Sequence, residues 1–360
     1  MKKIIFVFAL LFSTTIYAQP VRLAVAGIAH GHNGWILGRK NDAAVQLVGI
    51  YETNKELVKK MMDKYHLDPA LFYDDMNKML EEVKPEGVLG FGTTLQHLGV
   101  VEACAPKGIH VMVEKPLATT VADAEKMVGL ARKHKILLLT NFETSWYPTT
   151  DKSFALTRDT SFMGAIRKVV VHDGHEGPKE IGVSKEFFEW LTDPVQNGGG
   201  ALMDFGCYGA NLMTLLMNGS MPLSVTAVTS QFKPHIYPKV DDEATIILQY
   251  PGAQCIIQAS WNWPFARKDM AIYGSNGYII TKDNYNMKAK GKVGSEVDYK
   301  LTAQETNTYT SPFLYFADAI RNKISIPAFG AYSIENNLIV VRILEAARNS
   351  AKTGKTIYLK

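Results

Sequence analysis

The first part of the chain alternates between short apolar runs and segments with a helical repeat. The runs "RLAVAGI", "VQLVGIY", "IHVMVEK" and "ILLLTNF" are almost continuously apolar. Between them, segments such as "KELVKKMMDKYH" place apolar residues three or four positions apart, which is the spacing of one helix face. Strands without polar alternation are typical of a parallel sheet covered by helices on both faces. The pattern predicts a doubly wound α/β domain over residues 19–147.

After residue 147 the pattern changes to strands joined by short turns. The segments from "AIRKVVVHDG" to "MKAKGKV" are rich in β-branched residues, and "PGAQ" and "GSNG" fit hairpin connections. Helical spacing returns at residues 203–217, 312–321 and 333–352. We therefore expect an α+β domain over residues 148–360 with a mostly antiparallel, open sheet, used for substrate binding and oligomerisation. The C-terminal helix is expected to pack back on the first domain.

The N-terminal residues have the three regions of a secretory signal peptide. Lys2 and Lys3 precede the apolar run Ile4–Phe12, and the stretch "TTIYAQ" follows. The run is too short for a permanent membrane helix, and neither a twin arginine nor a cysteine lies near the cleavage point. We expect residues 1–18 to be removed after Ala18 and the mature chain to reach a bacterial periplasm without a membrane anchor. The alternative is a buried N-terminal strand.

Composition limits the kinds of partner. Of the 360 residues, 47% are hydrophobic and 21% are charged, which is typical of a globular protein with ample core. The formal net charge is +4 without a basic run, which argues against nucleic-acid binding. Cys104, Cys207 and Cys255 are widely separated. They form no disulfide framework or metal spacing, so we expect buried free thiols and no metal.

The stretch "VRLAVAGIAHGHNG" is a predicted strand that enters a glycine turn. The dinucleotide fingerprint Gly-x-Gly-x-x-Gly is incomplete, because Gly27, Ala29 and His32 stand at its three glycine positions. Gly27 can form the turn, Ala29 leaves the approach to pyrophosphate nearly open, and His32 is too large for close helix packing. The N–H groups of His30 and Gly31 can face a phosphate. Alone, a structural turn explains this loop equally well.

The second apolar run ends at Glu52. An acid at this position of a Rossmann domain bonds the adenosine ribose hydroxyls and repels the additional phosphate of NADP. No arginine follows it directly. Glu52 therefore favours NAD over NADP, with a solvated loop acid as the alternative.

Glu114 and Lys115 follow the apolar run "HVMV" and precede Pro116, which ends the strand. They therefore lie at the carboxyl edge of the predicted parallel sheet, where ligands of such sheets bind. A lysine in a partly dry cleft can have a lowered pKa, and it can polarise a hydroxyl or carry its proton. The alternative for this tripeptide is a surface turn.

Asp204 and Tyr208 follow the triple glycine Gly198–Gly200 and are four positions apart. On a continuous helix they would share one face. A tyrosine can pass a proton to or from a substrate oxygen, and a neighbouring carboxylate can orient it. The glycines provide flexible backbone or a close approach to a ligand. The alternative is a helix cap at Asp204 and a half-buried Tyr208.

These motifs together resemble the Gfo/Idh/MocA oxidoreductase family, which includes glucose–fructose oxidoreductase and inositol dehydrogenase. The Glu-Lys-Pro tripeptide, "GTTLQH" before it and the Asp204–Tyr208 pair resemble the family in order and spacing over nearly the whole mature chain. The resemblance implies an N-terminal Rossmann NAD-binding domain and a C-terminal α+β domain. It implies that Lys115, Asp204 and Tyr208 line the catalytic site. Residues implied near the nicotinamide are Thr93, His97, Glu114 and Lys115.

The chain departs from the family at the cofactor loop and at "NFETSWYP", which replaces a frequent arginine. Here Trp146 and Tyr147 can stack on the apolar face of a pyranose. In "VVVHDGHEGP", His172 and His175 can bond substrate hydroxyls, with ordinary loop histidines as the alternative and too few ligands for a metal. Free NAD is scarce outside the cytoplasm. The resemblance to glucose–fructose oxidoreductase implies a tightly bound NAD that is recycled.

We therefore expect a periplasmic NAD-dependent oxidoreductase that moves a hydride between nicotinamide and a sugar or glycoside hydroxyl, with Lys115 or Tyr208 taking the proton. The resemblance suggests carbon 3 and a 3-keto glycoside product. Two alternatives stay open: an NAD-dependent glycosidase that acts by transient oxidation and elimination, and a non-catalytic sugar- or nucleotide-binding protein. The open sheet face of the family predicts a homodimer or homotetramer.

Overall fold

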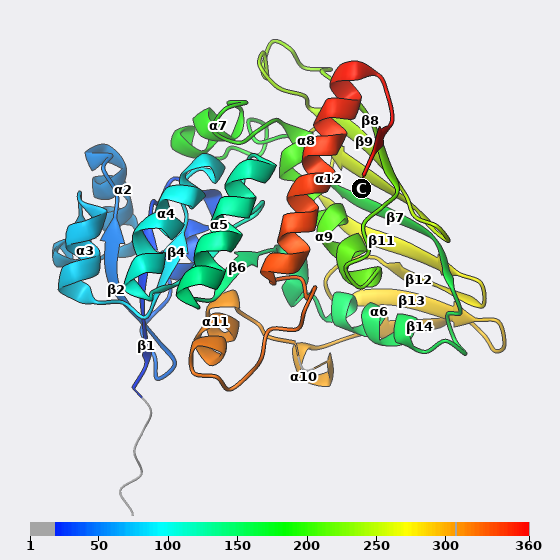
Figure 1. The fold of residues 1–360 in the computed structure, drawn as a ribbon, viewed down its shortest axis with the longest axis horizontal. Helices are drawn as coiled ribbons and strands as arrows, with labels where there is room; N and C mark the ends of the chain where they lie inside the picture. The colour runs from blue at the N-terminus through cyan, green and yellow to red at the C-terminus, as the bar shows by residue number, and fades with distance from the viewer. Residues whose placement is uncertain (1–18, 307, 360) are drawn as a thin grey trace, which may run out of the picture.

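The computed structural model describes residues 19–306 and 308–359. It contains two sheets, one in each half of the chain, which lie beside one another (Figure 1). The predicted signal peptide, residues 1–18 with cleavage after Ala18, lies outside the described residues. In the described part of the chain, no helix is both long and apolar enough to cross a membrane.

The first sheet is parallel and has the strand order β3-β2-β1-β4-β5-β6. Its strands are β1 (Val21–Ala26), β2 (Val45–Tyr51), β3 (Phe72–Tyr73), β4 (Gly87–Gly90), β5 (His110–Glu114) and β6 (Leu138–Asn141). The helices around it are α1 (Gly34–Leu37), α2 (Lys55–Tyr65), α3 (Met76–Val83), α4 (His97–Cys104) and α5 (Val121–His134). Separate apolar clusters lie on its two faces, which confirms the sheet predicted from the continuous apolar runs.

Within the described residues, the second sheet has nine strands in the order β14-β13-β12-β11-β7-β10-β9-β8-β15. The pairing is antiparallel except between β7 and β10. The strands are β7 (Ile166–Gly174), β8 (Ser224–Ser230), β9 (Glu243–Gln249), β10 (Gln254–Ser260), β11 (Arg267–Gly274), β12 (Gly277–Thr281), β13 (Asn286–Gly291), β14 (Val297–Lys300) and β15 (Ile357–Tyr358). The segments "PGAQ" and "GSNG" form the β9–β10 and β11–β12 hairpins, as predicted.

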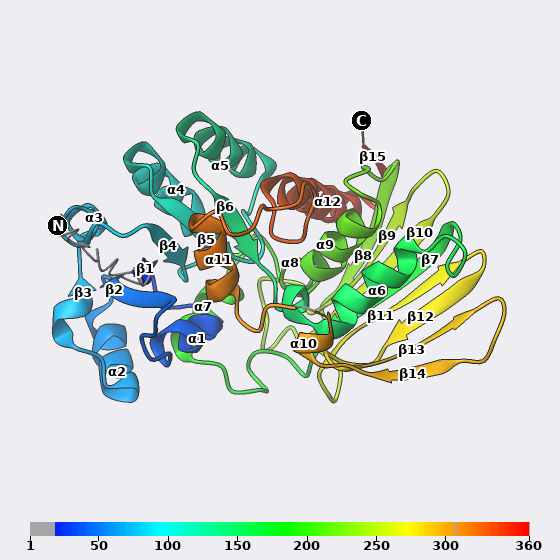
Figure 2. The same cartoon turned by 90° about the horizontal axis from the view of Figure 1, so that it is seen from below.

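Helices cover one face of the second sheet. The helices of this half of the chain are α6 (Pro148–Arg158), α7 (Lys185–Leu191), α8 (Ala201–Asp204), α9 (Gly206–Leu216), α10 (Ala303–Thr306), α11 (Pro312–Ile320) and α12 (Ile334–Thr353), and some of them form this cover. Figure 2 shows α6, α9 and α12 on the same side of the strands. Along β7, Val169, Val171 and Asp173 are buried on this side, whereas the alternate residues point to the open face.

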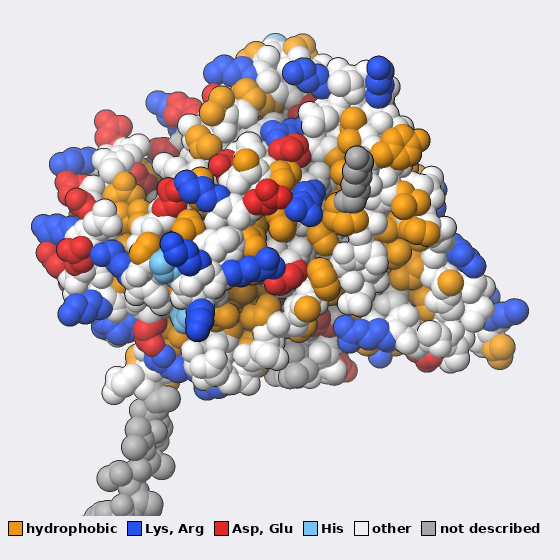
Figure 3. Space-filling view, viewed as in Figure 1, with side chains coloured by type: hydrophobic (Ala, Val, Ile, Leu, Met, Phe, Trp, Pro, Cys, Tyr) orange, Lys and Arg blue, Asp and Glu red, His pale blue; other side chains and the backbone are white. Residues whose placement is uncertain are grey.

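The two halves share their apolar packing. Phe316 of α11 belongs to the core cluster that contains Leu23 of β1, and Val341 of α12 belongs to the cluster that contains Val111 of β5. The C-terminal helix therefore packs on the first domain as well as on the second sheet. On the face shown in Figure 3, acidic and basic side chains are interspersed over the first half of the chain, whereas hydrophobic and basic side chains predominate over the second.

One helix that was predicted to be continuous is interrupted in the structure. The segment 203–217 is divided into α8 and α9 at Phe205. The carbonyl oxygen of Asp204 accepts hydrogen bonds from Lys115 Nζ at 3.0 Å and from Cys207 Sγ at 3.2 Å. The N–H of Tyr208 then donates to Phe205 rather than to Asp204. A tertiary contact therefore takes the carbonyl that would have continued the helix.

Candidate active site

The centre of the candidate site is a buried ion pair between Lys115 and Asp204. Lys115 follows β5, and Asp204 ends α8. The two side chains are 6% and 7% exposed, and the Lys115 ammonium donates to the Asp204 carboxylate. Trp261 Nε1 donates to the other carboxylate oxygen at 3.0 Å. Because both oxygens are bonded, the carboxylate is fixed beneath the carboxyl edge of the parallel sheet.

The pKa of Lys115 is shifted in the opposite direction from the one expected. Burial alone would lower the pKa of Lys115, but the Asp204 carboxylate raises it above the usual value. Burial alone would raise the pKa of Asp204, and Lys115 holds it below the usual value. The prediction of a lowered lysine pKa was therefore wrong, because the cleft places a carboxylate against the ammonium. The resting pair is charged.

Tyr208 lies beside this pair in an aromatic environment. Its ring packs edge-to-face on Phe142 with centroids 5.5 Å apart. The Nζ atoms of Lys115 and Lys268 lie 5.2 and 4.7 Å from the ring centroid of Tyr208. Burial raises the pKa of the Tyr208 phenol well above its usual value, so the group is protonated near neutral pH. The break between α8 and α9 moves Asp204 and Tyr208 off a shared helix face, yet both lie against Lys115.

Lys268 is a residue of the site that sequence reasoning missed. Its ammonium pairs with the Glu143 carboxylate, and Glu143 also accepts a hydrogen bond from Tyr147 Oη at 2.9 Å. Lys268 stands opposite Asp173 in the β7–β11 register. Asp173 is 1% exposed and neither carboxyl oxygen has a hydrogen-bond partner in the described chain. Burial raises the pKa of Asp173 well above its usual value.

A cavity of about 670 Å³ opens beside Lys268. Its charged lining is balanced in sign. The basic members are Arg267, Lys268 and Lys282, and the acidic members are Glu143, Asp269 and Asp283. Phe205 also lines it and lies 5.9 Å from Lys115 Nζ, so the cavity adjoins the ion pair.

Besides Asp204 and Tyr208, four residues were expected to bind substrate, and the structure separates these four. Tyr147 and His175 line the cavity, and burial lowers the pKa of His175. His172 does not line it: the residue is on the open face of β7, where its Nδ1 lies 3.0 Å from Asp269. Asp269 itself lines the cavity, so a role of His172 in substrate binding stays a prediction. Trp146 donates from Nε1 to Asn141 at 3.1 Å and packs against Trp35, away from the cavity lining.

The glycine loop has the geometry of a dinucleotide turn at its first position. Gly27 has a φ of +78°, and a Cβ there would lie 2.6 Å from Gly92 Cα. Only glycine fits this close approach of β1 and β4. Glu52 lies directly beside the turn, where its two oxygens accept from the N–H of Ile28 at 3.1 Å and of Asn54 at 2.9 Å. The carboxylate is thus held at the end of β2, where a ribose binds in this fold.

The side chains of His30 and His32 contact residues outside the glycine loop. The loop continues as a 3₁₀ turn, Gly31–Asn33, and His32 turns toward Glu114, with Nδ1 and Oε2 3.0 Å apart. Its ring stacks on Trp35 with centroids 3.7 Å apart. Asn141 donates to the other oxygen of Glu114 at 2.7 Å. Glu114 is therefore a fixed acceptor between the loop and β6.

His30, His32 and Glu114 also place three possible metal-ligand atoms within 4.8 Å of one another. His30 Nδ1 accepts a hydrogen bond from the His32 N–H at 3.1 Å. Its proton is therefore on Nε2, the atom that faces Glu114 at 4.0 Å. A metal ligand at that atom would have to be deprotonated, so this arrangement fits a hydrogen-bonded cluster better than a metal centre.

Thr93 and His97, which the family resemblance implies to lie near the nicotinamide, follow β4 at its carboxyl end. His97 Nδ1 is 3.1 Å from the Leu117 carbonyl, and burial lowers the pKa of His97 to about 4. Its Nε2 is buried without a partner in the described chain. An unpaired imidazole acceptor, a turn that only glycine fits and an anchored ribose carboxylate together fit NAD, and Gly27, Glu52 and His97 would hold it.

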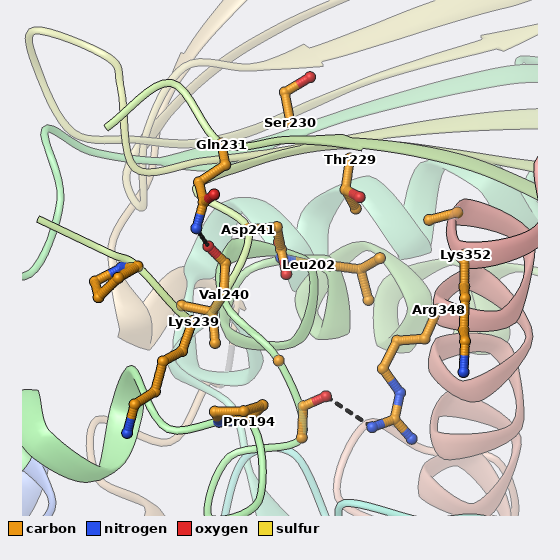
Figure 4. Close-up of a pocket in the computed structure, with 14 residues that line it drawn as sticks. Pro194, Leu202, Thr229, Ser230, Gln231, Lys239, Val240, Asp241, Arg348 and Lys352 are labelled. Atoms are coloured by element: carbon orange, nitrogen blue, oxygen red, sulfur yellow. Dashed lines mark hydrogen bonds between the residues drawn. The ribbon is translucent and has the colours of Figure 1, made fainter. Parts of the chain in front are cut away.

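The triple glycine forms a loop that approaches neighbouring segments of the chain closely. A Cβ on Gly200 would lie 1.8 Å from the backbone oxygen of Asp241. The Asp241 carboxylate accepts from the Gly200 and Leu202 N–H groups at 3.0 and 2.7 Å. Arg348 of α12 donates to the Gly198 carbonyl at 2.7 Å, which is the dashed contact beside Pro194 in Figure 4. The close approach is therefore to the chain itself, and the loop separates the site from a cavity of about 480 Å³ behind it.

Comparison with known proteins identifies relatives for both halves. Residues 21–142 match a family model described as an oxidoreductase family with an NAD-binding Rossmann fold, and residues 159–280 match the GFO/IDH/MocA C-terminal domain. The chain is 27% identical over 236 residues to trans-1,2-dihydrobenzene-1,2-diol dehydrogenase of Xenopus tropicalis. That match spans 65% of this chain and 66% of the relative's length.

Solved structures are similar over almost the whole chain. Aldose-aldose oxidoreductase from Caulobacter crescentus, complexed with glycerol, matches with a TM-score of 0.78 at 22% identity, covering 95% of this chain and 100% of the other. An inositol dehydrogenase homolog from Azotobacter vinelandii, complexed with NAD+, has a TM-score of 0.80 at 18% identity, covering 96% and 98%. At these identities the likeness establishes the fold.

Proposed function

The chain belongs to the Gfo/Idh/MocA oxidoreductase family, and from this membership we propose that it moves a hydride between NAD and a hydroxyl-bearing carbon of a sugar or glycoside. The observation that carries the proposal is the buried Lys115–Asp204 ion pair beside Tyr208. An isolated buried charge pair is costly to retain without a use. Here it lies at the carboxyl edge of the parallel sheet, next to both the glycine loop and the cavity with charged side chains in its lining.

The proton chemistry can be assigned to residues of the chain. Bound NAD supplies the hydride acceptor. The Lys115 ammonium, held by Asp204, polarises the substrate oxygen and stabilises negative charge on it. Tyr208 is protonated at rest and gives its proton to that oxygen in the direction of reduction. In the direction of oxidation the phenol first loses its proton to solvent, and the phenolate then takes the proton of the substrate hydroxyl. The ammonium groups of Lys115 and Lys268, which lie 5.2 and 4.7 Å from the centroid of the Tyr208 ring, attract the negative charge of that phenolate.

A neutral polyhydroxylated substrate is supported by the cavity. Its acidic and basic side chains balance, and each can bond hydroxyl groups without leaving an uncompensated charge. The names of two structural neighbours, aldose-aldose oxidoreductase and an inositol dehydrogenase homolog, support the same class. Oxidation at carbon 3 to a 3-keto glycoside rests on the family resemblance and is the regiochemistry we propose.

The first experiment is a cofactor assay on the purified mature chain. The protein is denatured, the chain is removed, and released nucleotide is identified by mass spectrometry. Stoichiometric NAD or NADH would support a tightly bound, recycled cofactor. NADP would contradict the assignment of Glu52, and a chain that neither contains nor binds NAD would overturn the proposed oxidoreductase.

Glycoside hydrolysis through transient oxidation is a second candidate. It requires additional acid–base groups at the sugar ring, and Glu143 and His175 both line the cavity. Incubation with glycosides separates the two reactions. An accumulating keto sugar with matching cofactor reduction supports the dehydrogenase, whereas free sugar without net NADH supports the glycosidase. Binding of sugar or nucleotide without turnover of either kind would support a non-catalytic protein.

We also propose export and self-association. Export rests on residues 1–18, and N-terminal sequencing of periplasmic protein should begin at Gln19. Self-association rests on the open face of the second sheet, which carries Val228 at 66% and Tyr273 at 40% exposure. Light scattering of the mature chain should give the mass of a dimer or tetramer, and a Val228→Lys variant should shift it toward the monomer.

A further inference from the structure

A segment of the second domain lies directly on the glycine loop. The segment, residues 184–197, contains α7 and the turn that follows it, and we call it the cover segment. The rings of Phe187 and Trp190 pack on His30 with centroids 5.0 and 5.6 Å apart. A Cβ on Gly31 would be only 3.1 Å from Phe187. Figure 2 shows α7 beside α1, at the edge of the first sheet.

The cover segment is anchored on both sides of the loop. Glu186 pairs with Lys60 of α2 at 3.1 Å. At the other end, Gln196 accepts a hydrogen bond from Thr93 Oγ1 at 2.9 Å, and its backbone carbonyl accepts from the Leu95 N–H at 3.0 Å. These anchor points follow β2 and β4, and the aromatic contacts lie on the loop after β1. The segment thus crosses the carboxyl edge of the strands where a dinucleotide lies in this fold.

We propose that the cover segment controls exchange of the dinucleotide, so that NAD enters and leaves only when α7 lifts from the glycine loop. Phe187 and Trp190 are the residues that hold it closed. This inference rests on NAD binding at the Gly27 loop and goes beyond the proposed reaction, because it assigns cofactor retention to residues of the second domain. It supplies a physical reason for an exported enzyme to keep its cofactor through many turnovers.

Two neighbouring rings of α7 allow this role to be distinguished from ordinary packing between the domains. Phe188, the neighbour of Phe187 on α7, packs on Tyr237 with centroids 6.1 Å apart, within the second domain. Both phenylalanines are half-buried and belong to one short helix. Removing either ring loosens α7, but only the loss of Phe187 removes a contact with the glycine loop. Phe188→Ala is therefore a matched control for Phe187→Ala.

The test measures release of NADH without turnover. Full-length mature chain is loaded with NADH, mixed with excess NAD+, and followed by the fall in bound-NADH fluorescence; retention after gel filtration is the second readout. We expect slow release from wild type and Phe188→Ala, and release roughly tenfold faster from Phe187→Ala, since an aromatic pair is worth about 0.5–1.5 kcal/mol and 1.4 kcal/mol is a factor of ten. Trp190→Phe keeps a ring but removes the indole N–H that lies 3.4 Å from the Ala29 carbonyl, and should give an intermediate rate.

Two results would overturn the proposal. Wild-type protein that binds NADH but releases it within the mixing time has no effective cover. Equal release rates for wild type, Phe187→Ala and Trp190→Phe, with unchanged melting temperatures, would show that these rings do not hold the cofactor. Failure of wild type to bind NADH at all is a distinct outcome, because it removes the oxidoreductase proposal together with the cover.

Discussion

The Lys115 ammonium bonds Asp204 twice, at its carboxylate and at its backbone carbonyl 3.0 Å away, across 89 positions of the chain. The bond to the carboxylate sets the charge of the site, and the bond to the carbonyl ends α8. The lysine that we propose as catalytic is a structural residue as well, and a substitution must be assessed for both effects. This joint role decides how variants of the pair should be designed.

Replacement of Lys115 by alanine should reduce turnover by about 10²- to 10⁴-fold, because the oxygen loses its polarising group. It should also lower the free energy of unfolding by about 3–5 kcal/mol, since Asp204 is left buried without its partner. The double variant Lys115→Met with Asp204→Asn should recover stability but not activity. Single-turnover hydride transfer and urea unfolding measure the two effects. Unchanged turnover in Lys115→Ala would contradict the assignment.

The Tyr208→Phe variant should keep the fold. Its kcat should fall by about 10²- to 10⁴-fold, as predicted for Lys115→Ala, with little change in KM. Its matched control is Tyr250→Phe. Tyr250 is also fully buried, and its hydroxyl has no partner in the described chain. Removing that hydroxyl should leave kcat unchanged and stability equal or higher. Equal activity of both variants would remove Tyr208 from the proton step.

The pair Glu143–Lys268 should make stability depend on acid pH. Burial would raise the pKa of Glu143, but Lys268, His32 and Tyr147 together lower it below its usual value, whereas burial raises the pKa of the nearby Asp173 well above its usual value. A lowered carboxylate pKa gives stability that is present above the unfolded value and lost as pH falls through the folded value.

Lys268→Met removes the main attraction, so burial should then raise the pKa of Glu143. The melting temperature of this variant should fall below that of wild type near neutral pH and approach it as the pH falls through the lowered folded-state pKa of Glu143, below which the carboxyl is protonated in both. Adding Glu143→Gln should abolish the pH-dependent difference. A difference that is constant over this range would mean that Glu143 does not titrate against Lys268.

The parallel sheet could be predicted because its strands carry the signal in their own composition. The positions of Gly27, Glu52 and Lys115 at strand ends followed from the same pattern. The opposite faces taken by the neighbours His172 and Asp173 did not follow from it, since one residue of register decides which face a side chain takes. Lys268 had no local signal, because its relation to Tyr208 depends on the pairing of β11 with β7.

The helix break at Phe205 and the cover segment show a second limit. Local spacing in "ALMDFGCYGANLM" favours one helix, and only the distant Lys115 removes the Asp204 carbonyl from it. The helix α7 is short, and its orientation on the glycine loop depends on contacts with His30 and Lys60 from the first domain. Sequence periodicity contains no information about such contacts.

Gly200→Ala should destabilise the chain, because the new Cβ would lie 1.8 Å from the Asp241 backbone oxygen and the loop would have to move. We expect a loss of at least about 2 kcal/mol, in the range of overpacked sites. Gly99→Ala is the control, because Gly99 lies in α4 with nothing within 4 Å of its added Cβ. It should stabilise the chain by about 0.5–1 kcal/mol. Chemical unfolding of both variants gives the comparison.

Cofactor choice should depend on the charge of Glu52. Glu52→Gln preserves size and can still accept from the Ile28 N–H, which lies 3.1 Å from the carboxylate in the native chain. It removes the repulsion of a 2′-phosphate and weakens bonding to the ribose hydroxyls, each bond to a charged group being worth about 1.5–3 kcal/mol. We expect about tenfold weaker NAD binding and a relative gain for NADP. Glu56→Gln, on the exposed first turn of α2, should change neither. Fluorescence titration with NADH and with NADPH measures the two affinities. An unchanged NADH-to-NADPH affinity ratio in Glu52→Gln would show that this carboxylate does not select the cofactor.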